Sequence, residues 1–443
     1  MLRWIANVLI WIALTAEIEG HIFANKWSTW LTPISTFFFK TILHIVPWDL
    51  AVVIVTLLSW QTSTKRRVQP VMQSMKYVVF AMAGSFVWGT LMGGQPYQAY
   101  FQTHCFIMGL VVALMVVNTC RTLAHVEALG KVIVFAALYR SLVCVWFYLE
   151  VAQHLPKEQE LAALTDHCDS VLFVGGLFVL VVNALERRKL GPLLWVLFGT
   201  ALIGFAIVVN NRRIAWLGVG VGFVLIYLLL PKGKLKKKIN WVLLALSPAI
   251  IAYVVAGWGN PVGIFKPVGS ISTMFGENQD TSSIMRDIEN YNLVRTLRWN
   301  PITGYGFGRQ YIEEVVAFDI SSIFPQYRYL PHNSLLGAIA FTGIIGFWGM
   351  WQMVAVAVFM HARVYRGSKH PTLRTASMAS LVGIVIIEVQ MWGDIGFNHQ
   401  MVTSMLAVAV GLAARMPIMA GVWETPAPAP APEPGAKPEP ARA

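Results

Sequence analysis

Apolar runs of about 17 to 25 residues recur along the whole chain, and they limit its fold more than any other feature. Each run is long enough for a helix to cross about 30 Å of hydrocarbon. Hydrophobic residues make up 56% of the 443 residues and charged residues 13%, against roughly 25% in a typical soluble domain. The sequence therefore predicts an all-α polytopic membrane protein, and it excludes a soluble enzyme, a β-barrel and a disordered scaffold.

Twelve membrane spans are expected, with boundaries accurate to several residues. They lie at 2–20, 48–63, 70–92, 105–121, 131–151, 170–186, 191–210, 213–230, 240–257, 333–360, 375–393 and 399–415. With a cytoplasmic N-terminus, nineteen Lys and Arg fall in inside loops and five in short outside loops. This bias predicts the orientation. It also accounts for the net charge of +12 without a nucleic-acid partner.

The spans divide the chain into four parts. These are spans one to nine with short loops (1–257), a large outer loop (258–332), spans ten to twelve (333–415) and a Pro/Ala-rich disordered cytoplasmic tail (424–443). The apolar segment 28–46 has a proline near each end, so we expect an interfacial helix on the outer face. No cleavage site follows the first apolar stretch, so a cleavable signal peptide is not expected.

The outer loop has the sequence of an ordered segment and not of a linker. Residues 281–299 show helical periodicity after a Ser that can cap a helix, and Pro301 ends that pattern. The glycines of 304–308 predict a tight turn, and a second helix is expected from Arg309 to about Phe318. Long ordered loops usually carry function, so we expect the site there.

Three arginines near the outer face are candidates for binding phosphate. Arg212 and Arg213 lie in a very short turn between two spans, on the side where basic residues are rare. Guanidinium groups bind phosphate bidentately, and a lipid-linked diphosphate would lie at this depth. The alternative is that both arginines are charges that extend to the membrane edge. Arg286, at the start of the loop helix, is the third candidate.

His332 and Asn333 lie where the loop re-enters the membrane. Asn333 and the following Ser can cap the next span, which places His332 at a helix N-terminus. The helix dipole disfavours protonation there, so a neutral imidazole with a pKa at or below about 6.5 is expected. Such an imidazole is suited to act as a general base. The alternative for His332 is a capping or interfacial residue.

Other charged residues lie within or near the spans. Arg140 and Glu388 lie inside spans five and eleven, where mutual pairing is slightly favoured over a substrate role. Asp394 and His399, at the outer end of span eleven, could contact the site. Four cysteines exclude a disulfide scaffold. Cys120 and Cys144 are expected to be inert, and a bridge between Cys105 and Cys168 is left open.

The order of the outer-face motifs resembles the O-antigen ligase / polysaccharide polymerase superfamily of bacterial inner membranes. The matching residues, within about 195–360, are Arg213, Ala215, Trp216, Leu217, Arg286, Pro301, Gly304, Gly306, Gly308, His332, Asn333, Leu336, Gly337, Gly343 and Gly346. In this family a small residue usually precedes the first arginine. Here two asparagines precede two arginines, so Arg213 is favoured but Arg212 could take its role.

The resemblance implies a glycosyltransferase with a GT-C-like helical fold and a site facing the periplasm. The donor would be a glycan on undecaprenyl diphosphate, and an O-antigen ligase would move it to the lipid A–core oligosaccharide. His332 would be the base, Arg213 and Arg286 would hold the diphosphate, and Arg212, Asn333 and Asp394 would help to bind substrate. The reaction is expected to invert the anomeric centre. No metal and no other cofactor is expected, because the sequence has no Asp-x-Asp motif at the outer face and no Walker motif. Three alternative functions are left open: a polymerase or a protein O-oligosaccharyltransferase of this superfamily, and a lipid-linked glycan transporter. The ligase is favoured over the polymerase because the chain has one large outer loop.

Overall fold

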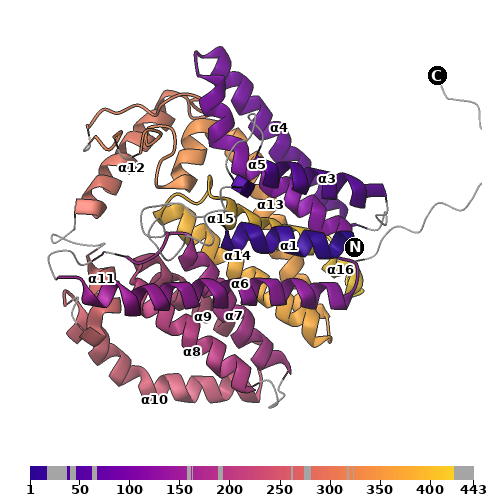
Figure 1. Cartoon of the computed structure of the whole chain (residues 1–443), viewed down its shortest axis with the longest axis vertical. Coiled ribbons are helices and arrows are strands. Elements are labelled where there is room, and N and C mark those ends of the chain that lie inside the picture. The colour runs from indigo at the N-terminus through magenta and orange to yellow at the C-terminus, as the bar shows by residue number, and fades with distance from the viewer. Residues whose placement is uncertain are drawn as a thin grey trace, which may run out of the picture.

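The computed structural model describes residues 1–16, 37–39, 46–61, 67–156, 161, 163–187, 193–260, 263–273, 281–316, 319–322 and 324–423. These residues form an all-helical bundle with no strand among them (Figure 1). Its helices are α1 (Leu2–Thr15), α3 (Pro47–Gln61), α4 (Gln69–Leu91), α5 (Pro96–Thr119), α6 (Leu123–Glu150), α7 (Asp169–Arg187), α8 (Leu193–Asn210), α9 (Arg213–Leu229), α10 (Lys234–Gly257), α11 (Lys266–Ser272), α12 (Thr281–Trp299), α13 (Ser334–Gly367), α14 (Pro371–Gly393), α15 (Gln400–Ala413) and α16 (Met416–Met419). Short 3-10 turns lie at Ala152–His154 and Gly263–Phe265.

Each of the twelve predicted spans coincides with one of these helices. Seven helices in the described part of the chain are long and apolar enough to cross a membrane, namely α5, α6, α7, α10, α13, α14 and α15 continued through α16. Four others, α1, α3, α8 and α9, are apolar but shorter. The chain is therefore a polytopic helical membrane protein. A count of twelve crossings and a GT-C-like arrangement stay predictions. The expected interfacial helix lies almost entirely outside the described residues, and the tail from 424 onward lies fully outside them.

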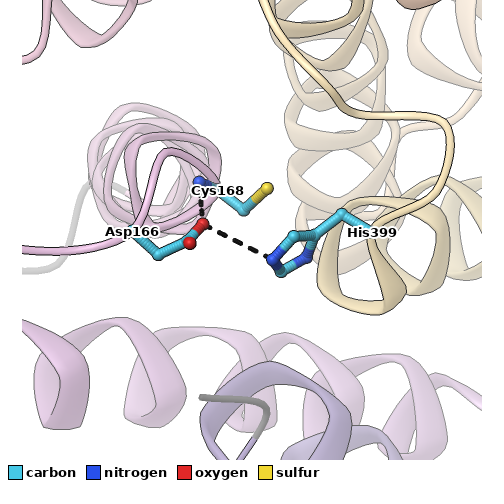
Figure 2. A group of neighbouring side chains, drawn as sticks. All are labelled: Asp166, Cys168 and His399. Carbon is cyan, nitrogen blue, oxygen red and sulfur yellow. Dashed lines mark hydrogen bonds and ion pairs between the residues drawn. The ribbon is translucent and has the colours of Figure 1, made fainter. Parts of the chain in front are cut away.

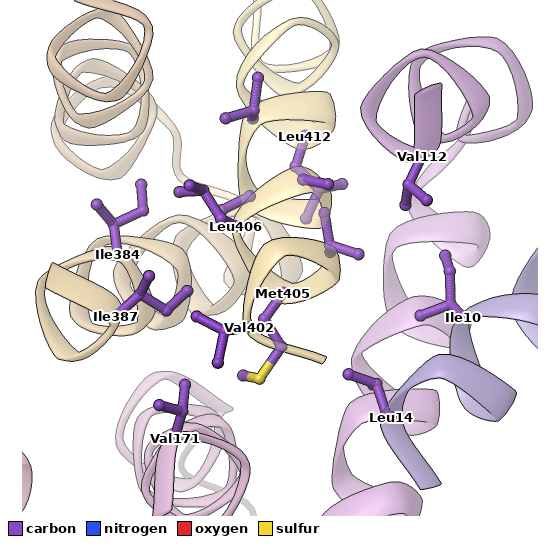
Figure 3. Close-up of a cluster of buried hydrophobic side chains, with 14 of the residues drawn as sticks. Ile10, Leu14, Val112, Val171, Ile384, Ile387, Val402, Met405, Leu406 and Leu412 are labelled. Carbon is purple, nitrogen blue, oxygen red and sulfur yellow. The ribbon is translucent and has the colours of Figure 1, made fainter. Parts of the chain in front are cut away.

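The centre of the bundle is α15, whose apolar stretch is 94% buried. Figure 3 shows Val402, Met405 and Leu406 of α15 among side chains from several other helices. Small residues permit this close packing. A Cβ added at Gly411 would lie 2.7 Å from the side chain of Val116 in α5. At the opposite extreme, none of the apolar stretch of α10 is buried, and this helix lies at the edge of the bundle (Figure 1).

The outer loop is fastened to the bundle at a break in α13. Gly343 has a φ of 65° and interrupts the helix, which leaves nearby carbonyl groups without their usual helical partners. The N–H groups of Tyr305 and Gly306 donate to the carbonyl oxygens of Ala340 (2.9 Å) and Phe341 (2.8 Å). The loop backbone thus replaces hydrogen bonds that the helix has lost.

Glycines make this contact possible, and the predicted turn at 304–308 is confirmed. Gly304, Gly306 and Gly308 all have φ between 75° and 87°, which other residues rarely adopt. Gly306 also approaches the backbone of Gly89 in α4 so closely that a Cβ would lie 2.3 Å from that Cα.

The predicted loop helix 281–299 is confirmed as α12, but the helix expected from Arg309 onward is wrong. Its described residues form bends and irregular backbone. The side chains of Thr296 and Asn292 in α12 accept hydrogen bonds from the N–H groups of Ile312 (2.8 Å) and Glu314 (3.1 Å). Because these N–H groups donate to side chains of α12, they are not available for the backbone hydrogen bonds of a second helix.

Candidate active site

His332 lies directly before α13 and is held by a carboxylate from α12. Glu289, 6% exposed, accepts the backbone N–H of His332 at 3.0 Å and faces its ring Nδ1 at 3.3 Å. A proton on Nδ1 satisfies this carboxylate and leaves the lone pair on Nε2. The arrangement therefore favours the imidazole tautomer that can accept a proton at Nε2.

The pKa expected for His332 from the helix dipole is wrong in direction. Burial lowers the pKa of His332, but hydrogen bonding to Glu289 and the charges of Glu289 and Asp394 outweigh burial and raise it above the ordinary value. The dipole of α13 acts on His332 as expected, but a full negative charge next to the ring is the larger effect.

Asn333 is the N-cap of α13, as predicted. Its Oδ1 accepts the N–H of Leu336 at 3.0 Å, and its amide donates to Asn290 of α12 at 3.1 Å. The side chain is buried and both of its ends are engaged. It fixes the start of α13 against α12, which also fixes the neighbouring His332.

Arg286 lies one helical turn before Glu289 on α12, so both side chains lie on the same side of that helix. Its guanidinium is 3.6 Å from the carboxylate of Asp394, which is buried at the end of α14. Asp394 also pairs with His167. Burial would raise the pKa of Asp394, but the charges of His167, Arg286 and His332 outweigh burial and lower it. Asp394 is therefore ionised at neutral pH and balances the cations around it.

Arg212 joins the same polar network from the turn between α8 and α9. Asn211 makes this turn with a φ of 52°, a conformation that Asn tolerates better than most residues. Arg212 donates to the carbonyl oxygen of Thr165 at 2.7 Å, and its Nη1 is 3.0 Å from Nδ1 of His167. A chain of contacts therefore runs from Arg212 through His167 and Asp394 to Arg286.

Arg213 points toward the loop helices. Its Nη1 donates to Oγ1 of Thr273 at 3.2 Å and to Oγ of Ser283 at 3.1 Å. Ser283 lies one turn before Arg286 on α12. Arg213 and Arg212 thus reach the surroundings of Arg286 from two different directions.

The expected pairing of Arg140 with Glu388 is wrong. Arg140 in α6 is fully buried and donates two 2.7 Å hydrogen bonds to Asp169 at the start of α7. Glu388 accepts a hydrogen bond from the indole of Trp351 at 2.9 Å. Both groups are engaged within the bundle, and neither belongs to the network around Asp394.

A second polar group lies beside His167, where Asp166 fastens the segment before α7 to the start of α15 (Figure 2). Asp166 accepts the N–H of Cys168 at 2.8 Å and contacts Nε2 of His399 at 3.4 Å. Burial would raise the pKa of Asp166, but these contacts outweigh burial and lower it. The donor atoms of Asp166, Cys168 and His399 lie within 4.8 Å of one another, so in the described residues this group has donors that zinc accepts. The expectation of a metal-free reaction stays a prediction.

The cysteines themselves carry no bridge. Cys105 and Cys168 are both buried free thiols, so the bridge that the sequence left open is not formed. Cys120 and Cys144 are buried free thiols as well, as expected.

Two residues of this site, Glu289 and His167, were missed by the sequence analysis. Glu289 follows Arg286 by three positions in a predicted helix, and that spacing was the available signal. His167 lies in a short loop with no periodicity, and its role depends on Asp394, which is more than 200 residues away along the chain.

The comparison with known families identifies the central part of the chain. Residues 198–351 match the family model described as O-antigen ligase. The match begins in α8 and ends in α13, so it includes Arg212, Arg213, Arg286, Glu289 and His332. No curated protein matches the chain significantly. Residues 198–351 are therefore similar to an O-antigen ligase domain, which supports the resemblance to the O-antigen ligase / polymerase superfamily, a group of glycosyltransferase-like membrane enzymes.

Proposed function

We propose that the chain is an O-antigen ligase. It moves a glycan from undecaprenyl diphosphate to the lipid A–core oligosaccharide at the periplasmic face of the bacterial inner membrane. The observation that carries this proposal is the contact of Glu289 with both the backbone and the ring of His332. A transferase needs a base held in one tautomer near a cationic group, whereas a transporter that breaks no bond has no use for such a base.

In the proposed reaction, Nε2 of His332 accepts the proton of the acceptor hydroxyl as its oxygen attacks the anomeric carbon. The glycosyl–phosphate bond breaks, and the electron pair leaves with the diphosphate. Arg286, together with Arg213 or Arg212, stabilises the departing negative charge. One displacement inverts the anomeric centre. Activation is already present in the diphosphate, so the reaction needs no nucleotide and no metal.

Asp394 and Asn333 are positioning residues in this proposal and do not contact the substrate. A buried carboxylate would repel a diphosphate, but next to Arg286 and His167 it holds both side chains in place before the donor binds. The side chain of Asn333 is occupied as the N-cap of α13, so in this proposal His332, and not Asn333, contacts the hydroxyl of the acceptor substrate.

The reaction is tested with purified protein, lipid-linked glycan and lipid A–core, in the absence of ATP and added metal. We expect a ladder of lipopolysaccharide from the native protein. His332→Gln should lower the rate by about 10²–10⁴-fold while donor binding is kept, since Gln can hydrogen-bond a hydroxyl but not take its proton. A His332→Gln protein with the native rate would leave a lipid-binding protein without a catalyst.

The choice of acceptor separates the related activities. Growth of the glycan on undecaprenyl diphosphate without lipid A–core would indicate a polymerase, and transfer to protein would indicate an oligosaccharyltransferase. Movement of intact donor across a liposome membrane with no transfer product would support a transporter.

A further inference from the structure

A cavity of about 310 Å³ lies between α6, α7, α14 and α15. One end of its lining is polar, with Glu127 and Lys131 near the start of α6, Arg187 at the end of α7, and Thr372 at the start of α14, and we call this polar end the mouth. The site around His332 lies at the other ends of α7 and α14, where Asp169 and Asp394 are found. Since α7 runs from Asp169 to Arg187, the two sites are about 27 Å apart along its axis.

The interior of the cavity is mostly apolar, with Asn183 and Ser380 as polar exceptions, and it is elongated. Its lining on α14 runs from Thr372 to Ile387, about 22 Å along the helix axis. That length exceeds the roughly 15 Å that half of a bilayer's hydrocarbon core occupies. Gly130 and Gly383 line the cavity, and a Cβ at either position would meet no described atom within 4 Å. The space therefore has the reach and the lining of a site for one lipid chain.

The mouth of the cavity contains polar groups whose hydrogen bonds are incomplete. Thr375 is 8% exposed and lines the cavity, yet its hydroxyl has no partner among the described residues. Arg187 pairs with Glu127, but its buried Nε has no acceptor among those residues either. Buried polar groups are nearly always hydrogen-bonded, so two such atoms at one opening indicate a missing acceptor.

We propose that this cavity binds one anionic phospholipid, with its phosphate at Arg187 and Lys131 and an acyl chain along α14. Arg187 and Lys131 outnumber the single acid Glu127 at the mouth. A phosphate oxygen is the acceptor that Nε of Arg187 and the hydroxyl of Thr375 lack. Basic pockets between helices at the cytoplasmic membrane face are known to hold anionic head groups. The Lys/Arg distribution predicts that face for this end of the bundle. The inference does not depend on the transfer reaction.

Native mass spectrometry of the purified full-length protein tests the site, with added phosphatidylglycerol and, in parallel, phosphatidylcholine. We expect one phosphatidylglycerol to be retained in preference to phosphatidylcholine. The double change Lys131→Gln with Arg187→Gln should weaken its binding by about 30-fold. The matched control is Arg363→Gln, an arginine of α13 that stacks on Trp423 and does not line the cavity, which should bind lipid like the native protein.

Gly383→Leu tests the chain-binding part of the cavity without removing a charge. Leu is a better helix former than Gly, so the fold should be kept, and thermal unfolding measures this. We expect Gly383→Leu to lose bound phosphatidylglycerol. The proposal would be overturned if both the double charge variant and Gly383→Leu bound phosphatidylglycerol as tightly as the native protein does. It would also be overturned if the native protein bound glycerol phosphate, which has no acyl chain, as tightly as it binds phosphatidylglycerol.

Discussion

Replacing Glu289 with Gln tests the proposed role of His332 most directly. The carboxylate accepts two donors, the N–H of His332 at 3.0 Å and the ring at 3.3 Å. An amide of the same shape has only one acceptor oxygen. Its NH₂ group would therefore face either the backbone N–H or the ring N–H of His332, and two donors cannot form a hydrogen bond with each other. If the ring contact is lost, the proton can move to Nε2, and the imidazole no longer acts as a base on the acceptor.

The size of the effect follows from the number of contacts changed. A hydrogen bond to a charged group is worth about 1.5–3 kcal/mol, which corresponds to roughly 10- to 150-fold in rate. Loss of the reactive tautomer costs more: in serine hydrolases, exchange of the equivalent carboxylate for an amide lowers the rate about 10⁴-fold. We therefore expect Glu289→Gln to lower kcat/KM by between about 10- and 10⁴-fold.

The pH profile distinguishes this role from a merely structural one. The base must be unprotonated, so the rate falls as pH drops through the pKa of His332. Glu289 raises that pKa, and its removal should move the acid limb of kcat/KM to lower pH. The matched control is Glu314→Gln, an acid of the same loop that pairs with exposed Arg295, and it should leave rate and profile unchanged. A Glu289→Gln protein with the native rate and the native acid limb would refute the reasoning.

Three further predictions use the same preparations or intact cells. Arg286→Lys and Arg213→Lys should each lower the transfer rate by about 10²–10³-fold, because Lys cannot replace a bidentate contact, and near-native rates in both would contradict the phosphate-binding role. Arg140→Met should destabilise the protein by about 3–5 kcal/mol in thermal unfolding because it leaves Asp169 buried and unpaired, whereas the double change with Asp169→Leu should recover most of the loss. A Cys placed at Lys238 should resist an impermeant thiol reagent in intact cells, and its labelling would reverse the predicted orientation.

The sequence predicted the helices well because long apolar runs leave few alternatives to helix formation. Each of the twelve expected spans coincides with a helix in the described part of the chain, and α12 has the predicted limits. The ends were less predictable: α5 begins at Pro96, nine residues before the expected start, because its first two turns are polar enough to read as a loop. The failed helix after Arg309 has a different cause, since Asn292 and Thr296 compete for its backbone and no local pattern reveals them.

The candidate site was predictable in its residue types but not in its pairings. Arg286 stood out because it lies at the start of the predicted loop helix, and His332 because it lies where the loop meets the next span. Their partners come from distant segments, so the dipole of α13 looked like the main influence on His332 until Glu289 was placed beside it. The same limit explains the error over Arg140, whose true partner Asp169 lies at a helix start and not within a span.

The break of α13 at Gly343 has a consequence for how the protein is assembled in the membrane. The carbonyl groups of Ala340 and Phe341 find their donors in residues 305 and 306, which belong to the loop that precedes α13 in the chain. Gly306 must also meet Gly89 of α4, which is inserted much earlier. A partly inserted chain would therefore hold these carbonyl groups unsatisfied in hydrocarbon, at a cost of several kcal/mol each. Docking of the loop therefore has to follow the insertion of both α4 and α13, and the segment around His332 gains its final geometry only when these contacts have formed.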